Sequence, residues 1–152
     1  MKVGFTCSTF DLFHAGHVMM LKEARTQCDY LVVGLQSDPT VDRNWKNKPV
    51  QSLFERFVQL QACKYVDEII PYTTEKELRD ILTSYQIDIR IIGEEYRDQR
   101  FTGYDLPTEV YFNSRQHSFS TTELRQRVLQ VNTQMQASTQ KPVELKLEPL
   151  KE

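Results

Sequence analysis

Apolar residues recur along this chain with two different spacings, and the alternation between them predicts an α/β fold. The continuous apolar run from Tyr30 to Leu35 is typical of a strand covered on both faces. Strands are expected over residues 2–7, 30–35, 66–70, 87–92 and 110–112, and helices over 15–27, 52–63, 74–85 and 120–131. This alternation predicts a Rossmann-like, doubly wound, mainly parallel five-stranded sheet with helices on both faces.

Capping signals place the starts of three of these helices. A Ser or Thr followed three residues later by Glu forms a capping box, in which each side chain accepts the other residue's backbone N–H. The pairs are Ser52 with Glu55, Thr74 with Glu77, and Ser120 with Glu123. Pro71 is expected to end the third strand, and residues 37–51 and 94–107 are expected to be loops.

The length of 152 residues fits one domain, or one domain with a tail. We expect the domain to cover residues 1–131 and the tail to cover 132–152. The tail is rich in Gln, Thr, Ser and Lys and lacks a helical apolar face, so a disordered or peripheral segment is one interpretation. The alternation of Val143, Leu145 and Leu147 with polar residues also fits a late edge strand.

Composition narrows the function class. A net charge of −2 gives no broad basic surface, so nucleic acid is not expected as a partner. No apolar run approaches the ~20 residues of a membrane span, and Met1 leads straight into a strand without a signal-peptide pattern. Three cysteines without Cys-x-x-Cys spacing indicate reduced thiols in a cytoplasmic protein, not disulfides or a zinc site.

Two histidines flank a glycine where the first strand gives way to the first helix. In a strand–turn–helix geometry His14 and His17 lie in the first helical turn, where free N–H groups and the helix dipole attract anions. Each imidazole could then donate to a phosphate oxygen and stabilise charge in a transition state. Metal ligation is a weaker alternative, because zinc needs three or four ligands and no third is signalled nearby. A structural role is the other weaker alternative, since it is usual for a lone histidine but not for a pair that flanks a glycine at a strand-to-helix turn.

Two segments carry a family resemblance. Residues 9–17 read Thr-Phe-Asp-Leu-Phe-His-Ala-Gly-His and resemble the His-x-Gly-His signature of the nucleotidyltransferase superfamily, closest to its glycerol-3-phosphate cytidylyltransferase branch. Residues 115–122 read Arg-Gln-His-Ser-Phe-Ser-Thr-Thr and resemble that branch's Arg-Thr-Glu-Gly-Ile-Ser-Thr-Thr. The resemblance covers about residues 1–131. It implies cytidylyl transfer from CTP to a small phosphorylated alcohol, with glycerol-3-phosphate as the first expected acceptor, Mg²⁺ on the triphosphate, and a homodimer.

The resemblance also implies roles around the first motif. The backbone N–H groups of Thr9 and Phe10 would face the α-phosphate. Gly16 would leave space for the nucleotide, since a side chain there would fill it. Asp11 has two open interpretations: it caps a turn, or it orients a histidine or a magnesium-bound water.

The second motif would hold the leaving pyrophosphate. Ser120, Thr121 and Thr122 open the last helix, and together with Arg115 they exceed what helix capping needs. His117 stands where the family has Glu, and it adds a third histidine near the site.

Loop residues complete the implied site. Lys46 and Lys48 match two family lysines if one residue is inserted upstream, one reaching the acceptor phosphate and the other the nucleotide. Arg56 is expected to be an internal buttress or ion pair, not a direct ligand. Glu95, at the end of the fourth strand, is the candidate for contact with the nucleoside, and a plain acidic strand end is its alternative. His14, His17, Lys46 and Arg115 are therefore the expected catalytic residues.

Three alternatives stay open at this point. The acceptor could be phosphoethanolamine, phosphocholine or a sugar-like phosphate, and the nucleotide could be ATP. A non-catalytic nucleotide sensor is the alternative of a different class, although a sensor could shed the groups that act only in the transition state.

Overall fold

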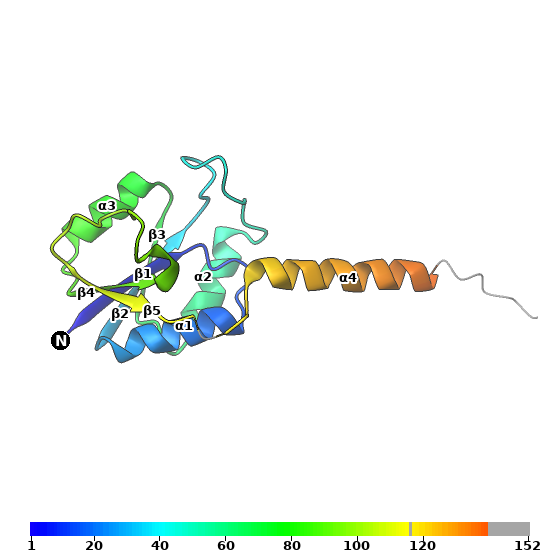
Figure 1. The fold of residues 1–152 in the computed structure, drawn as a ribbon, viewed down its shortest axis with the longest axis horizontal. Helices are drawn as coiled ribbons and strands as arrows, with labels where there is room; N and C mark the ends of the chain where they lie inside the picture. The colour runs from blue at the N-terminus through cyan, green and yellow to red at the C-terminus, as the bar shows by residue number, and fades with distance from the viewer. Residues whose placement is uncertain (116, 140–152) are drawn as a thin grey trace, which may run out of the picture. The chain divides into compact units, whose positions relative to one another are not determined.

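A computed structural model describes residues 1–115 and 117–139. Its five strands form one all-parallel sheet in the order β3-β2-β1-β4-β5 (Figure 1). The strands are β1 (Val3–Ser8), β2 (Tyr30–Gln36), β3 (Glu68–Tyr72), β4 (Ile89–Gly93) and β5 (Glu109–Asn113). The predicted Rossmann-like architecture is confirmed.

Helices cover both faces of the sheet. On one face α1 (Ala15–Thr26) and α2 (Leu53–Gln61) pack against a core formed by Phe10, Leu21, Ala24, Leu31, Val33, Leu35, Leu60, Ile89 and Ile91. On the other face α3 (Glu75–Ser84) packs against Phe5, Val32, Tyr72, Leu78 and Leu82. β1, β2 and β4 are interior strands, and their apolar side chains alternate between these two cores.

Two of the predicted capping boxes are present. Ser52 Oγ accepts the Glu55 N–H at the start of α2, and the Glu55 carboxylate accepts the Ser52 N–H at 2.7 Å. Thr74 and Glu77 form the equivalent pair at the start of α3. The proposed box of Ser120 with Glu123 stays a prediction.

Two element ends differ from expectation. β3 continues through Pro71 to Tyr72, because β3 is an edge strand and the missing N–H of a proline is tolerated at an edge. The last helix, α4 (Thr121–Thr139), does not stop near Val131, and no Gly or Pro interrupts residues 132–139. Its extension means that the first part of the expected tail is helical. The alternation of Val143, Leu145 and Leu147 lies outside the described residues.

The chain divides into two compact units, Met1–Thr121 and the segment from Thr122 onward. The strands, α1, α2 and α3 belong to the first unit, and the second contains the exposed apolar residues Val128, Leu129, Val131 and Met135. The domain boundary expected near residue 131 stays a prediction. No helix in the described part of the chain is long and apolar enough to cross a membrane.

The strand order places the functional crevice of this fold. The chain builds outward from β1 through β2 to β3, and then continues on the other side of β1 with β4 and β5. In open α/β sheets, ligands bind at such a switch point, beyond the carboxyl ends of the strands. Here that point lies between the ends of β1 and β4.

Candidate active site

His14 and His17 cap the helix that carries them. His14 is the N-cap residue of α1, and its Nδ1 accepts the Gly16 N–H at 3.0 Å. His17, at the third helical position, accepts the His14 N–H on its own Nδ1 at 3.2 Å. This is a capping box in which both members are histidines. The spacing of three residues that suggested a phosphate site is therefore also the spacing of a cap.

The capping box fixes the protonation pattern of both rings. A backbone N–H can only donate, so each Nδ1 must be the unprotonated acceptor and each neutral ring carries its proton on Nε2. Burial, followed by the charge of His14, lowers the pKa of His17 to about 3. Burial, then the charges of His117 and Arg115, also lowers the pKa of His14. At neutral pH the two imidazoles are thus neutral Nε2–H donors.

A stack of rings holds the two histidines in place. The His17 ring packs against the His14 ring with centroids 3.8 Å apart, and against the Phe13 ring with centroids 5.6 Å apart. Phe10 is fully buried and presents its ring at 63° to His17, with centroids 5.4 Å apart. The Phe10 ring is therefore part of both the core and the stack. The predicted role of its backbone N–H toward a phosphate is separate and stays a prediction.

The turn that precedes the histidines is strained. Phe10 and Leu12 have φ values of +48° and +51°, in the left-handed region that bulky side chains rarely occupy. Such conformations cost about 1–3 kcal/mol each and persist where the surroundings over-determine them. They cluster at functional sites, which agrees with the position of this turn at the end of β1.

The carboxylate of Asp11 helps to hold the strained turn in this conformation. Asp11 is buried, and its two oxygens accept the N–H groups of Val50 at 2.9 Å and Gln51 at 3.0 Å. In return, the Gln51 side chain accepts the Leu12 N–H at 2.8 Å. Asp11 thus ties the strained turn to the segment that enters α2. A role for Asp11 toward a magnesium-bound water stays a prediction.

Gly16 lies under two imidazole rings. A β-carbon at this position would come within 2.9 Å of the Cε1 atoms of both His14 and His117. The close approach around Gly16 is therefore to rings of the protein itself. His117 is next to the first motif, as expected for a third histidine near the site, and its Nδ1 is buried with no hydrogen-bond partner among the described residues.

The two sequence motifs meet at Thr121. His14 Nε2 lies 3.2 Å from Thr121 Oγ1, and that hydroxyl donates weakly to the Asp11 carbonyl at 3.4 Å. Since His14 Nε2 carries the proton, His14 donates to Thr121. Arg115 is exposed, and its charge reaches His14, as the lowered His14 pKa shows. Residues that are more than 100 positions apart in sequence are thus brought together at one helix N-terminus.

The remaining predicted residues lie at the start of α4, in the β2–α2 loop and after β4. Ser120 is half-buried before α4, and Thr122 is exposed in its first turn. Lys46 and Lys48 lie on the exposed loop between β2 and α2, where neither ammonium makes a hydrogen bond or ion pair with a described residue. Glu95 is exposed in the short 3₁₀ helix η1 (Glu94–Tyr96), and its carboxylate folds back over Gly93 at the end of β4.

Arg56 is the internal buttress that the sequence suggested. It is 2% exposed and forms no ion pair among the described residues. Its guanidinium donates to five carbonyl oxygens, those of Thr9, Gln36, Ser37, Gln51 and Ser52. The Thr9 carbonyl, at 2.9 Å, places the end of β1 relative to the end of β2. Arg56 therefore supports the strained turn after β1 through the Thr9 carbonyl.

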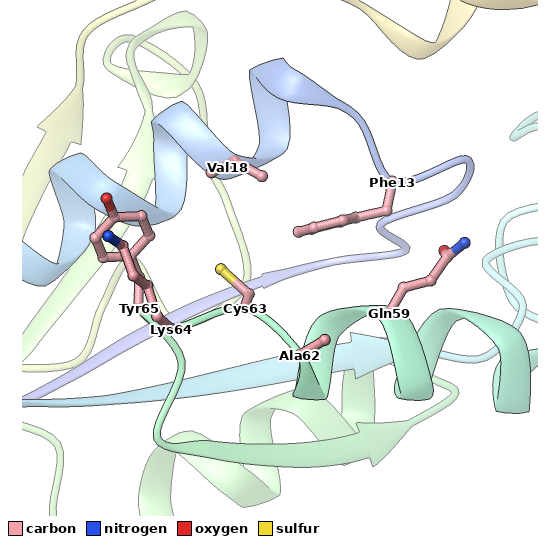
Figure 2. Close-up of a pocket in the computed structure, with 7 residues that line it drawn as sticks. All are labelled: Phe13, Val18, Gln59, Ala62, Cys63, Lys64 and Tyr65. Carbon is pink, nitrogen blue, oxygen red and sulfur yellow. The ribbon is translucent and has the colours of Figure 1, made fainter.

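A separate pocket of about 510 Å³ adjoins the ring stack (Figure 2). It lies between α1 and α2 and is lined by Phe13, Val18, Gln59, Ala62, Cys63, Lys64 and Tyr65. Its walls are mainly apolar, and it adjoins the histidines through Phe13, which stacks on His17, and through Val18, whose N–H donates to the His14 carbonyl at 3.2 Å. The predicted phosphate-binding residues are at the helix N-terminus and do not line this pocket.

The geometry at α1 suits an anion that gains charge. Two neutral imidazoles carry Nε2–H groups, and the N-terminus of the helix adds the positive end of a dipole. Donors that are already oriented stabilise developing negative charge without reorganising. Within the described residues no group of three or more His, Cys, Asp or Glu side chains could hold a metal ion.

Sequence reasoning missed three features of the site. The spacing of His14 and His17 was visible as a possible capping box, but histidine is not among the residues that usually signal one. No glycine marked the left-handed backbone at Phe10 and Leu12. The contact between His14 and Thr121 depends on tertiary folding, and no local pattern signals it.

Comparison with known proteins agrees with this geometry. A family model described as "Cytidylyltransferase-like" matches residues 5–127. A crystal structure of a lipopolysaccharide core biosynthesis protein from Thermoplasma volcanium aligns with a TM-score of 0.55 and 23% identity, covering 87% of this chain and 89% of that one. At that identity the structural match supports the fold alone.

Curated relatives are longer than this chain. An ethanolamine-phosphate cytidylyltransferase from Arabidopsis thaliana is 36% identical over 115 residues, which cover 72% of this chain and 27% of the relative. A probable ethanolamine-phosphate cytidylyltransferase from Encephalitozoon cuniculi is 37% identical, covering 92% and 44%. The bifunctional protein HldE from Campylobacter jejuni is 32% identical, covering 84% and 28%. The chain spans less than half the length of these three relatives. The family model matches most of this chain, and the chain therefore belongs to the cytidylyltransferase-like family.

Proposed function

We propose that this chain catalyses the transfer of a cytidylyl group from CTP to a small phosphorylated alcohol, releasing pyrophosphate. The observation that carries the proposal is the meeting of the two motifs, in which His14 and His17 present Nε2–H donors at a helix N-terminus and His14 contacts Thr121. Family membership and the names of the relatives support cytidylyl transfer to a phosphorylated acceptor.

In this mechanism the acceptor phosphate attacks the α-phosphorus of CTP in line, and pyrophosphate leaves from the opposite side. One P–O bond forms and one breaks, so no covalent enzyme intermediate is needed. Catalysis then rests on positioning and on charge stabilisation. His14 and His17 would donate to phosphate oxygens as charge develops, while the backbone at Thr9 and Phe10 would receive the α-phosphate.

The leaving group and the acceptor are assigned to the surrounding residues. Arg115, with the hydroxyl groups of Ser120, Thr121 and Thr122, would hold the β- and γ-phosphates. Lys46 would reduce the repulsion between the acceptor phosphate and the nucleotide phosphates, and Lys48 would contact the nucleotide. Both lysines lie on the exposed loop, which would have to approach the bound substrates. When bound, Mg²⁺ would neutralise the triphosphate, with Asp11 as the candidate to orient one of its waters.

Glycerol-3-phosphate is the acceptor that we propose first, on the resemblance of both motifs. The ethanolamine-phosphate relatives make phosphoethanolamine the second candidate. We also propose a homodimer, which sedimentation of the purified protein would test. A single sedimenting species at the mass of one chain across concentrations would count against it.

The experiment that tests the function is a pyrophosphate-release screen of CTP and ATP against a panel of phosphorylated alcohols. We expect CTP to exceed ATP in kcat/KM by about tenfold or more, because base-edge hydrogen bonds are worth about 1–3 kcal/mol each. Glu95→Ala should reduce this preference, whereas Arg115→Ala should weaken both nucleotides alike. Equal use of CTP and ATP would refute the base assignment, and binding of CTP without turnover on any acceptor would indicate a sensor.

A further inference from the structure

A second polar cluster lies at the switch point, on the α3 face of the sheet. Cys7 in β1 packs with the core on that face, as does Tyr72 in β3. Arg90 follows Ile89 and precedes Ile91, which both face the opposite core, so its side chain also lies on the α3 face. The Tyr72 hydroxyl and the Arg90 guanidinium both act on the pKa of the Cys7 thiol, so the three polar groups are neighbours on this face. We call these three residues the β1–β4 cluster.

Arg90 gives this cluster an uncompensated positive charge. Its residue exposure is 6%, and its guanidinium donates to the Thr102 carbonyl and lies over the Phe101 ring. No carboxylate forms an ion pair with Arg90 in the part of the chain that the structure describes. Buried charges in proteins are normally paired, so a guanidinium left without a carboxylate at the switch point is unusual.

The other charges near the cluster, on Arg43 and Glu75, cancel each other, so the charge of Arg90 remains uncompensated. Arg43 pairs with Glu75 at 2.8 Å, and the second Glu75 oxygen accepts the Thr102 hydroxyl at 2.6 Å. Burial raises the pKa of both Cys7 and Tyr72, so both are neutral at pH 7. The cluster and its surroundings therefore carry one net positive charge.

The cluster opens to solvent at the carboxyl edge of the sheet. Cys7 belongs to an interior strand and is nevertheless partly exposed, and the side chains of Arg43 and Glu75 beside it are 25% and 27% exposed. Thr9, at the proposed phosphate site, follows Cys7 by two residues. Their Cα atoms are thus about 7 Å apart along an extended strand. That separation is the length of a small phosphorylated alcohol.

We propose that the β1–β4 cluster receives the end of the acceptor opposite its phosphate, and that it selects a neutral polyol over an amine. The proposal rests on the proposed function. A hydroxyl group can accept from the Arg90 guanidinium and donate to Cys7 or Tyr72, whereas an ammonium has only donors and carries the same charge as Arg90.

The test compares two acceptors of similar size, glycerol-3-phosphate and phosphoethanolamine, with CTP in the pyrophosphate-release assay. For the unmodified chain we expect kcat/KM to favour glycerol-3-phosphate by tenfold or more. Arg90→Gln keeps an amide donor for the Thr102 carbonyl but removes the charge. It should shrink this ratio by at least tenfold, mainly through KM. Arg90→Lys keeps the charge and should keep the ratio.

Arg79→Gln is the matched control, because Arg79 lies on α3 in an exposed ion pair with Asp105 and touches no member of the cluster. It should leave both acceptors unchanged. A wild-type preference for phosphoethanolamine would overturn the proposal. An acceptor ratio that Arg90→Gln does not alter would do the same.

A second measurement needs neither turnover nor a variant. Cys7 is alkylated with N-ethylmaleimide and quantified by mass spectrometry, with Cys28 and Cys63 as internal references. Glycerol-3-phosphate should protect Cys7 at least threefold better than phosphoethanolamine, and equal protection would overturn the proposal. If no acceptor releases pyrophosphate, the proposed function fails, and Cys7 protection still decides what the cluster binds. If Arg90→Gln does not fold, this alkylation measurement on the unmodified chain still tests the proposal.

Discussion

His14 has two separable jobs, and two substitutions distinguish them. Its Nδ1 caps α1 through the Gly16 N–H, and its Nε2 contacts Thr121 and is proposed to donate to phosphate. Asparagine is among the best N-cap residues, so His14→Asn keeps the cap but loses the imidazole. Alanine at the same position loses both.

The expected sizes of the two effects differ enough to be measured apart. Loss of the cap costs about 1 kcal/mol, which for a chain of this length is a fall in Tm of about 2–4 °C. Loss of a preorganised donor to the transition state costs about 10²-fold or more in kcat. His14→Asn should therefore melt within about 1 °C of the unmodified protein and turn over about a hundredfold more slowly. His14→Ala should show the same kinetic loss together with the lower Tm.

The assays are calorimetric unfolding and pyrophosphate release under saturating CTP. Turnover by His14→Asn close to that of the unmodified protein would refute a chemical role for the imidazole. Global unfolding of His14→Ala would show that the ring is chiefly structural. His17→Gln provides the parallel case, because Gln at the third helical position preserves the capping box while removing the ring that His14 and Phe13 hold between them.

Three further predictions follow from the structure. The pKa of His17 is about 3 in the folded chain, below its ordinary value, so the unfolded state binds more protons between pH 6.5 and pH 3. The contribution of His17 to stability is therefore complete above pH 6.5 and is lost as the pH is lowered through this window. By pH 5 the free energy of unfolding should drop by about 2 kcal/mol in urea titrations, a drop that His17→Gln should abolish; a flat profile would contradict the burial of a neutral ring. Arg56→Met leaves the carbonyls of Thr9, Gln36 and Ser37 without their donor, and it should lower the free energy of unfolding by about 3 kcal/mol; a loss below about 1 kcal/mol would show that water replaces the guanidinium. A chain truncated after Asn132 should stay folded and active, since the sheet and its covering helices lie within Met1–Thr121; insoluble protein would reveal that the remainder of α4 is needed.

The sequence predicted the sheet because its signals are local. The apolar run of β2 and the capping boxes at Ser52 and Thr74 depend on neighbouring residues, and all three appear as expected. The errors at Pro71 and Val131 have different causes, since only the first depends on surroundings that the local pattern does not contain. An edge position tolerates Pro71, and the helix past Val131 continues because nothing in residues 132–139 stops it.

The site was partly visible for the same reason. The resemblance located His14 and His17, and their spacing gave the first helical turn. The roles of Asp11 and Arg56 could not be decided, because their partners lie tens of residues away along the chain. The β1–β4 cluster gave no signal, since Arg90 in an otherwise apolar strand has no meaning until β1 and β4 are paired.

The hydrogen bonds of Arg56 allow the loop between β2 and α2 to vary in length. Gln36 and Ser37 stand where the β2–α2 loop begins, and Gln51 and Ser52 stand where it ends, so one buried guanidinium closes the loop at its base. Doubling the length of a closed flexible loop costs only about 0.6 kcal/mol. The intervening segment, with Lys46 and Lys48, can therefore gain or lose residues while the phosphate-facing turn keeps its shape. Insertions here should change which acceptors are taken up long before they affect folding.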